Sequence, residues 1–263
     1  MYGLGVNKLG VTNSTGFNPY TLFTDDTKGA WYDMSDLSTM FKVDGTTPAV
    51  VGEAVGKITD KSGNGHDLIQ TNSDKCPILR VDTDGKLCLD FTTDDGMRTT
   101  LDLPFGTNTV NEMSVFAAVK KESNDLNQTV AELSNSVGTN QGAFRLFYAS
   151  ANQWRAIQKG TTDNTIVSGS IGNPDKAILT TVASIAAPSH DFRRNGSSIQ
   201  SNTNTLGTGN YGDYPLNIGG RANGASANLD GKIYGLIVLG KVTNATEISN
   251  VESYLSGKSG VTI

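Results

Sequence analysis

The acidic residues whose positions first suggest chemistry are Asp94, Asp95 and Asp230. Asp94-Asp95-Gly96 and Asp230 lie near expected loops, and carboxylate oxygens are the ligands that calcium prefers. An Asp-Gly pair is also common in a tight turn that needs no cation. Because no EF-hand spacing accompanies these residues, the sequence predicts no metal and no other cofactor, and it leaves calcium open as an alternative.

The same carboxylates do not form a hydrolytic pair. A retaining glycosidase holds two carboxyl groups about 5–5.5 Å apart, whereas the neighbours Asp94 and Asp95 point to opposite faces if the chain is extended there. The chain has only two histidines, His66 and His190, and both lie in sequences typical of turns. Since a serine or cysteine nucleophile needs a positioned base, the sequence predicts no catalytic residue and no enzyme.

Two aromatic residues are candidates for carbohydrate binding. Tyr148 and Trp154 lie on neighbouring expected strands, and they can stack on a sugar if they reach a concave surface. Large aromatics on alternating strands more often fill the core between two sheets. Both alternatives remain open at this point.

The elements that would position these residues are strands. Apolar residues alternate in the segments 113–119 and 144–148, a third strand begins at Trp154, and a β-branched strand is expected over 176–185. Asn195-Gly196 is a strong two-residue hairpin signal. Strands that recur at a spacing of roughly ten residues favour a β-sandwich over an alternation of helices and strands.

The segment from Gly231 to Gly240 is predicted to be a central strand. Apolar residues occupy both faces of its two-residue repeat, so both faces should be covered. Strict alternation assigns Ile233, Ile237 and Leu239 to one face, and Tyr234, Leu236 and Val238 to the other.

One helix is predicted after this strand. Asn244 lies three residues before Glu247, and such a pair can cap the first free backbone N–H groups of a helix. Gly257 is predicted to end the helix. An apolar stripe at helical spacing lies between them, formed by Ile248, Val251, Tyr254 and Leu255.

Composition and charge exclude several classes of protein. The chain has a net charge of −5 and a pI near 5.0, which argue against a protein that binds duplex DNA through a basic face. No segment has the roughly 20 apolar residues that a membrane-spanning helix needs. The first thirty residues lack the features of a secretory signal, so folding is expected in a cytoplasm.

The two cysteines match no metal-binding or redox motif. Cys88 alternates with Leu87 and Leu89 in an expected strand, which predicts a reduced and buried thiol. A disulfide between Cys76 and Cys88 remains the alternative.

Residues 1–28 are predicted to form an extended arm ahead of a single domain, residues 29–263. The arm is rich in glycine, asparagine and threonine, and such a segment cannot bury enough apolar surface to order itself alone. Its scattered apolar residues favour an assembly arm that a partner fixes over a disordered tail. The residues of this prediction are Tyr2, Leu4, Val6, Leu9, Phe17 and Tyr20.

Several motifs resemble those of a known fold. The order Leu-x-Ile-Gly-Gly from Leu216, a polar loop, Asp-Gly-x-Ile-x-Gly-Leu-x-Val from Asp230 and the final helix resembles the end of a concanavalin A-like (laminin-G-like) domain. The segment 86–98 resembles an early strand and turn of that fold, and the segment 192–196 resembles its hairpin. The resemblance implies an all-β jelly-roll sandwich of two antiparallel sheets with one short C-terminal helix.

A narrower resemblance covers nearly the whole chain. The segments 1–7, 31–41, 60–66 and 258–263 together resemble a group of bacteriophage virion proteins that carry this domain. This resemblance implies a non-enzymatic structural protein, a lectin-like knob that is attached through its arm and decorates the particle or its tail. It implies a virion location after synthesis in the host cytoplasm, with other virion proteins and copies of the same chain as partners.

The alternative function is that of a carbohydrate-binding adhesin, a receptor-binding protein that recognises host surface glycans. Individually weak sites would become useful through many copies. The two functions are compatible, because a virion protein can also bind sugar. Neither function involves nucleic acid or membrane insertion.

Overall fold

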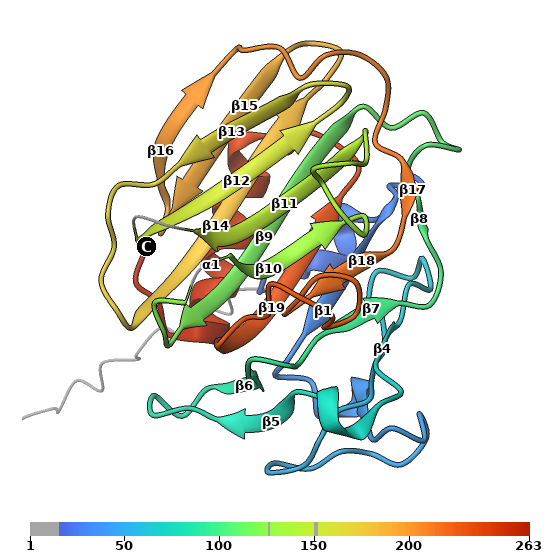
Figure 1. Ribbon diagram of the computed structural model, residues 1–263, viewed down its shortest axis with the longest axis vertical. Coiled ribbons are helices and arrows are strands. Elements are labelled where there is room, and N and C mark those ends of the chain that lie inside the picture. The colour runs from blue at the N-terminus through green and yellow to red at the C-terminus, as the bar shows by residue number, and fades with distance from the viewer. Residues whose placement is uncertain (1–15, 126, 150–151) are drawn as a thin grey trace, which may run out of the picture.

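The computed structural model describes residues 16–125, 127–149 and 152–263. Two antiparallel sheets pack face to face, and the one α-helix among these residues lies behind one of the sheets (Figure 1). The predicted sandwich of two antiparallel sheets with one C-terminal helix is therefore confirmed. No helix within the described ranges is long and apolar enough to cross a bilayer.

The first sheet has eight strands. Its order is β16 (Ser197–Asn202), β15 (Ser189–Arg194), β14 (Asp175–Ser184), β9 (Glu112–Lys121), β19 (Gly231–Leu239), β6 (Leu87–Phe91) and β5 (Ile78–Val81). The eighth strand, β1 (Gly29–Asp33), pairs with the second half of β19, and β6 pairs with the first half. The turn between β15 and β16 is the predicted Asn195-Gly196 hairpin, in which both residues have positive φ angles.

The second sheet has nine strands. Its order is β13 (Asp163–Val167), β12 (Gln153–Lys159), β11 (Ala143–Ala149), β10 (Gln128–Leu133), β18 (Leu216–Ile218), β7 (Met97–Thr99), β4 (Leu68–Ile69), β3 (Lys57–Ile58) and β2 (Met40–Phe41). A separate two-stranded ribbon joins β8 (Leu103–Pro104) to β17 (Asp213–Tyr214). Short 3₁₀ turns occupy Pro19–Leu22, Leu37–Thr39 and Ser73–Lys75.

The main core lies between the two sheets and takes side chains from both. Val115 and Val119 on β9 face inward together with Leu146 on β11 and Ala156 on β12. The alternation predicted for β9 is confirmed, because Phe116 and its neighbour on the other face lie in a second cluster outside the sheet.

Strand β19 is central and is covered on both faces, as predicted, but two of its side chains lie on the faces opposite to the prediction. Its register against β9 shifts between Ile233 and Gly235. This bulge interrupts the two-residue repeat, because the extra residue reverses the alternation on one side of it. Ile233 therefore joins Leu236 in the core between the sheets, and Tyr234 joins Ile237 on the outer face.

The outer face of the eight-stranded sheet, called the covered face below, lies under helix α1 (Ala245–Ser259). Asn244 and Glu247 form the predicted capping box. The prediction that Gly257 ends the helix is wrong: the helix continues to Ser259, and Gly260 takes the left-handed conformation with φ 78°. A glycine inside an exposed last turn weakens a helix without ending it, whereas the left-handed glycine reverses the chain direction.

Part of the predicted N-terminal arm belongs to the domain. Leu22 and Phe23 are buried on the covered face in the cluster that contains Trp31 and Leu255. Phe17 packs edge to face against a tyrosine of α1. The prediction that the arm orders only against a partner is therefore wrong for residues 16–28, because the covered face itself supplies the apolar surface.

Of the remaining residues in the arm prediction, only Tyr20 lies in the described part of the chain. Tyr20 is half exposed at 52%. The other four residues of the arm prediction lie outside the described residues: Tyr2, Leu4, Val6 and Leu9.

Both cysteines are free, buried thiols. Burial raises the pKa of Cys76 to about 11 and that of Cys88 to about 12. The predicted buried thiol is therefore present at Cys88, and the alternative of a disulfide is not realised in this structure.

Candidate functional site

One row of side chains crosses the outer face of the nine-stranded sheet, called the open face below. Arg98 on β7 pairs with Asn217 on β18, Asn217 pairs with Glu132 on β10, and Glu132 pairs with Arg145 on β11. Directly opposed residues of antiparallel strands point to the same face, and the residues flanking them lie in the core. The whole row in sheet order is Phe41, Lys57, Ile69, Arg98, Asn217, Glu132, Arg145, Ile157 and Thr165.

A buried charge cluster occupies the middle of this row. The Glu132 carboxylate is fully buried between the guanidinium groups of Arg145 and Arg221, with Nε–Oε2 distances of 3.3 and 2.8 Å. The contact with Arg221 Nε is an ion pair whose angle falls short of a hydrogen bond. Burial lowers the pKa of Arg145 to about 10, with Arg221 adding repulsion and Glu132 opposing the shift. The cluster therefore holds two guanidinium groups for one carboxylate.

The cluster also holds the connection between β10 and β11 in place. The Val137 backbone N–H donates to Glu132 Oε1 at 2.6 Å, and Arg221 Nη2 donates to the Ser136 hydroxyl at 3.0 Å. Asn217 Nδ2 donates to the Ser134 carbonyl oxygen at 2.8 Å. These three hydrogen bonds hold the residues on both sides of Asn135, so polar side chains of the sheet and of Arg221 position an exposed loop residue.

A pocket of about 360 Å³ opens on the open face beside this loop. Its volume lies within the range of about 300–1,000 Å³ that is common for ligand sites. Four segments that are distant in sequence line it: Ile69 from β4; Arg98, Thr99, Thr100 and Asp102 from β7 and the turn after it; Asn135 from the β10–β11 connection; and Tyr214 with Pro215 from β17 and the residue that follows.

The pocket has polar groups that are free to meet a ligand. Within the described ranges, the side chains of Arg98, Asp102, Asn135 and Tyr214 make no ion pair and no hydrogen bond. The first three are exposed, and Tyr214 is half-buried with its ring packed against the core. An aromatic ring beside such donors and acceptors suits a sugar, because the ring can cover a C–H face while the polar groups pair with hydroxyls.

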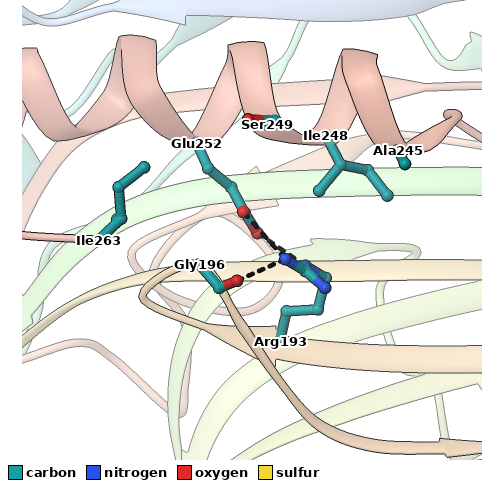
Figure 2. Close-up of a pocket in the computed structure, with 7 residues that line it drawn as sticks. All are labelled: Arg193, Gly196, Ala245, Ile248, Ser249, Glu252 and Ile263. Atoms are coloured by element: carbon teal, nitrogen blue, oxygen red, sulfur yellow. Dashed lines mark hydrogen bonds and ion pairs between the residues drawn. The ribbon is translucent and has the colours of Figure 1, made fainter.

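The pocket beneath α1 differs in this respect. It measures about 320 Å³ and lies between α1, the β15–β16 hairpin and Ile263 (Figure 2). Arg193 donates to both carboxylate oxygens of Glu252, at 2.9 and 3.2 Å, and to the Gly196 carbonyl oxygen at 2.6 Å. Glu252 also accepts a hydrogen bond from Thr180. Because these charged groups already satisfy one another, we assign them the role of holding α1 on the covered face.

Tyr148 and Trp154 lie in the core between the sheets. Both side chains are fully buried, their ring centroids are 5.8 Å apart, and Trp154 Nε1 donates to Asp175 at 2.6 Å. They occupy the inward positions of β11 and β12, so neither ring is accessible to a sugar. The carbohydrate-binding prediction for these two residues is therefore wrong, and the alternative that they fill the core is confirmed.

The acidic residues proposed for calcium come from two segments that do meet. Asn228, from the loop before Asp230, donates to the Asp95 carbonyl oxygen at 2.8 Å. Among the residues with described positions, however, no three acidic, histidine or cysteine side chains, Asp94 included, converge on a possible metal site. The Asp95 carboxylate instead accepts two hydrogen bonds from Thr92, and burial raises its pKa. The Asp95 carboxylate therefore stabilises a turn with Thr92.

Both histidines are buried, although their sequences are typical of solvated turns. The ring nitrogens of His190 lie 2.9 Å from the Thr181 hydroxyl and 3.3 Å from the Asn164 amide oxygen. Burial lowers the pKa of His190 to about 3. Burial also lowers the pKa of His66, whose backbone N–H is bound by Asp60. His190 therefore belongs to a hydrogen-bonded interior network, and His66 to a buried turn.

Sequence reasoning missed the residues that line the open-face pocket. The alternation Met97-Arg98-Thr99 does indicate that Arg98 points outward from a half-buried strand. No local signal places it beside Asn135 or Tyr214, because those residues meet it only through the pairing of distant strands.

Residues 91–249 match the family model described as the concanavalin A-like lectin/glucanases superfamily. The match spans more than half of the chain and includes most of the pocket. The chain therefore belongs to this superfamily, as its motifs suggested. No curated protein sequence matches the chain.

Solved structures with a similar fold include domain 4 of AbnA, a GH43 extracellular arabinanase from Geobacillus stearothermophilus, in complex with arabinotriose. It is 15% identical, with 89% of this chain and 98% of that chain covered and a TM-score of 0.57. Botulinum neurotoxin type C is 14% identical over 88% of this chain and 51% of that chain, with a TM-score of 0.59. A Trypanosoma rangeli sialidase is 13% identical over 87% and 32%, with a TM-score of 0.56. At these identities the likeness shows the fold alone.

Proposed function

We propose that this chain is a non-catalytic, lectin-like domain that binds glycan in the open-face pocket. The observation that carries the proposal is the set of free polar groups around Tyr214. In the pocket beneath α1, by contrast, the charged groups already pair with one another. The superfamily is consistent with this function. Two structures of the same fold add support: the arabinanase domain holds arabinotriose, and the neurotoxin interacts with gangliosides.

A glycan array tests the proposal, with the chain displayed multivalently because single sites of this kind are weak. Wild type should retain at least one bacterial polysaccharide or host glycan. Tyr214→Ala should lose about tenfold in affinity, which corresponds to about 1.4 kcal/mol, and Asn135→Ala should also bind more weakly. Tyr20→Ala is the matched control, because that tyrosine is exposed outside the pocket, and its binding should be unchanged.

Two results would contradict this function. Absence of all glycan binding at high valency would remove the lectin proposal. Turnover of a bound polysaccharide by the purified chain would remove the non-catalytic part. Circular dichroism of each variant separates a lost contact from a lost fold.

We place this lectin in a bacteriophage virion, attached through residues 1–15 as an assembly arm, on the tail or as a decoration of the particle. This context rests on the sequence motifs, and their spatial proximity supports it. The Trp31 backbone N–H donates to Asp60, and Lys258 pairs with Asp33 at 2.9 Å. Three of the four motifs that resemble virion proteins therefore lie next to one another in the fold.

Mass spectrometry of purified particles tests the virion context. The chain should be present in the particle, and deletion of residues 1–15 should abolish its incorporation while leaving glycan binding intact. Absence of the full chain from particles, or undiminished incorporation of the truncated chain, would contradict the proposed attachment.

A further inference from the structure

The arginines of this chain divide into two groups. Five of the seven pair with a carboxylate in the described structure: Arg80, Arg145, Arg193, Arg194 and Arg221. Within the same residues, Arg98 and Arg155 have no carboxylate within ion-pair distance. Both point outward from the nine-stranded sheet, since their strand neighbours Met97 and Trp154 lie in the core. The two guanidinium groups without a partner are therefore both on the open face.

Arg98 is placed to meet a ligand directly. It is exposed, it lines the pocket, and its neighbours along the row are the uncharged residues Ile69 and Asn217. Asp102 also lines the pocket but lies beyond ion-pair distance. A planar guanidinium with free N–H groups binds a carboxylate in a bidentate manner, which a hydroxyl group cannot reproduce.

The buried cluster adds positive potential behind Arg98. Glu132 lies two strands away, at about 10 Å given the spacing between strands, and its cluster has two guanidinium groups for one carboxylate. Glu132 and Arg145 are buried and Arg221 is partly buried, and buried or partly buried charges are screened much less by salt than exposed ones. The cluster thus favours an anion in the pocket although the whole chain has a net charge of −5.

We infer that the open-face pocket selects sugars that carry a carboxylate, such as hexuronic or nonulosonic acids, with Arg98 as the residue that binds the carboxylate. This inference rests on the proposed glycan-binding function and narrows its ligand class. Tyr214 then covers the sugar ring, and Asn135 and Asp102 pair with its hydroxyl groups.

The test uses an array of bacterial polysaccharides, each printed in its native form and after chemical reduction of its carboxyl groups. Native acidic polysaccharides should be retained, and carboxyl reduction should weaken binding at least tenfold. Arg98→Gln should remove this difference, and Arg98→Lys should keep part of it. Arg80→Gln is the control, because that arginine lies on the other sheet, and it should leave the preference unchanged.

The outcomes separate the two proposals. Equal binding of native and reduced forms, or a preference for neutral or phosphate-bearing sugars, overturns the carboxylate inference and leaves the lectin function standing. Failure of the wild-type chain to bind any polysaccharide removes both. Retention of the preference by folded Arg98→Gln overturns the assignment of the residue.

Discussion

The covered face and the open face of this sandwich are built from similar antiparallel strands but bury different kinds of side chain. On the covered face, Phe116, Tyr234 and Ile237 are sealed beneath α1 by Val251 and Leu255. On the open face, the corresponding outward row holds arginines, an asparagine and a glutamate. The covered face contributes stability through apolar burial. The open face keeps polar groups that can recognise a ligand.

The two faces also differ in how their charged side chains are paired. Beneath α1, Arg193 and Glu252 form a one-to-one pair. On the open face, Glu132 pairs with two arginines. Arg98 has no carboxylate partner among the described residues. Neutral pairing suits a contact that only has to hold an element in place. An excess of positive charge instead favours an anionic ligand, whose negative charge balances it.

The largest effect is expected from Glu132→Gln. Removing the carboxylate of the cluster leaves the buried Arg145 and the partly buried Arg221 without compensation, and breaking a buried pair in this way costs about 3–5 kcal/mol. Urea denaturation of the variant should show this loss in the free energy of unfolding. Glu122→Gln, at a partly exposed pair with two lysines, should cost about 1 kcal/mol or less. Equal losses would show that the cluster is not a buried charge centre.

Leu255→Ala should destabilise the covered face by about 2–5 kcal/mol, because it leaves a cavity beneath a fully buried leucine. Ile157→Ala gives the comparison on the open face. Ile157 is only partly buried there, so its truncation should cost less free energy of unfolding. Thermal or urea unfolding of both variants measures the difference. Similar losses would mean that the two faces contribute alike to stability.

Acid should act on the interior between the two faces. Because burial lowers the pKa of His190 to about 3, the folded state binds its proton less readily than the unfolded state, whose pKa is about 6.5. Stability should therefore fall with pH from about 6.5 towards 3, by up to about 1.4 kcal/mol per pH unit. His66 adds a change of the same sign. In His190→Gln, the free energy of unfolding should depend less steeply on pH. An unchanged slope would contradict the role assigned to His190.

The smallest effect on stability is expected from Arg98→Ala. Arg98 is exposed and unpaired in the described structure, so its removal should change the free energy of unfolding by no more than about 0.5 kcal/mol. Its loss should instead weaken glycan binding. A large loss of stability in urea denaturation would show that Arg98 has a structural partner.

Much of the fold could be predicted because its signals are local. The alternation in β9, the Asn195-Gly196 hairpin and the capping box at Asn244 are each set by a few adjacent residues. The errors have local causes as well. The bulge between Ile233 and Gly235 in β19 places Ile233 and Tyr234 on the faces opposite to those that strict alternation predicts.

The candidate binding site could not be predicted in the same way. Arg98, Asn135 and Tyr214 are far apart in sequence and meet only because β7, β10 and β18 are neighbours in the sheet. From the sequence, Tyr148 and Trp154 could either stack on a sugar or fill the core, and their inward positions on β11 and β12 bury them. Strand order, which no single segment encodes, decides which polar residues share a face.

The most direct test is to map ligand contacts by NMR, titrating isotope-labelled protein with a fragment of the polysaccharide that binds best. The chemical shifts of Arg98, Thr100, Asn135 and Tyr214 should change, while those of Arg193, Ala245 and Glu252 beneath α1 should not. Shift changes confined to the α1 pocket, with the open face unaffected, would contradict the account.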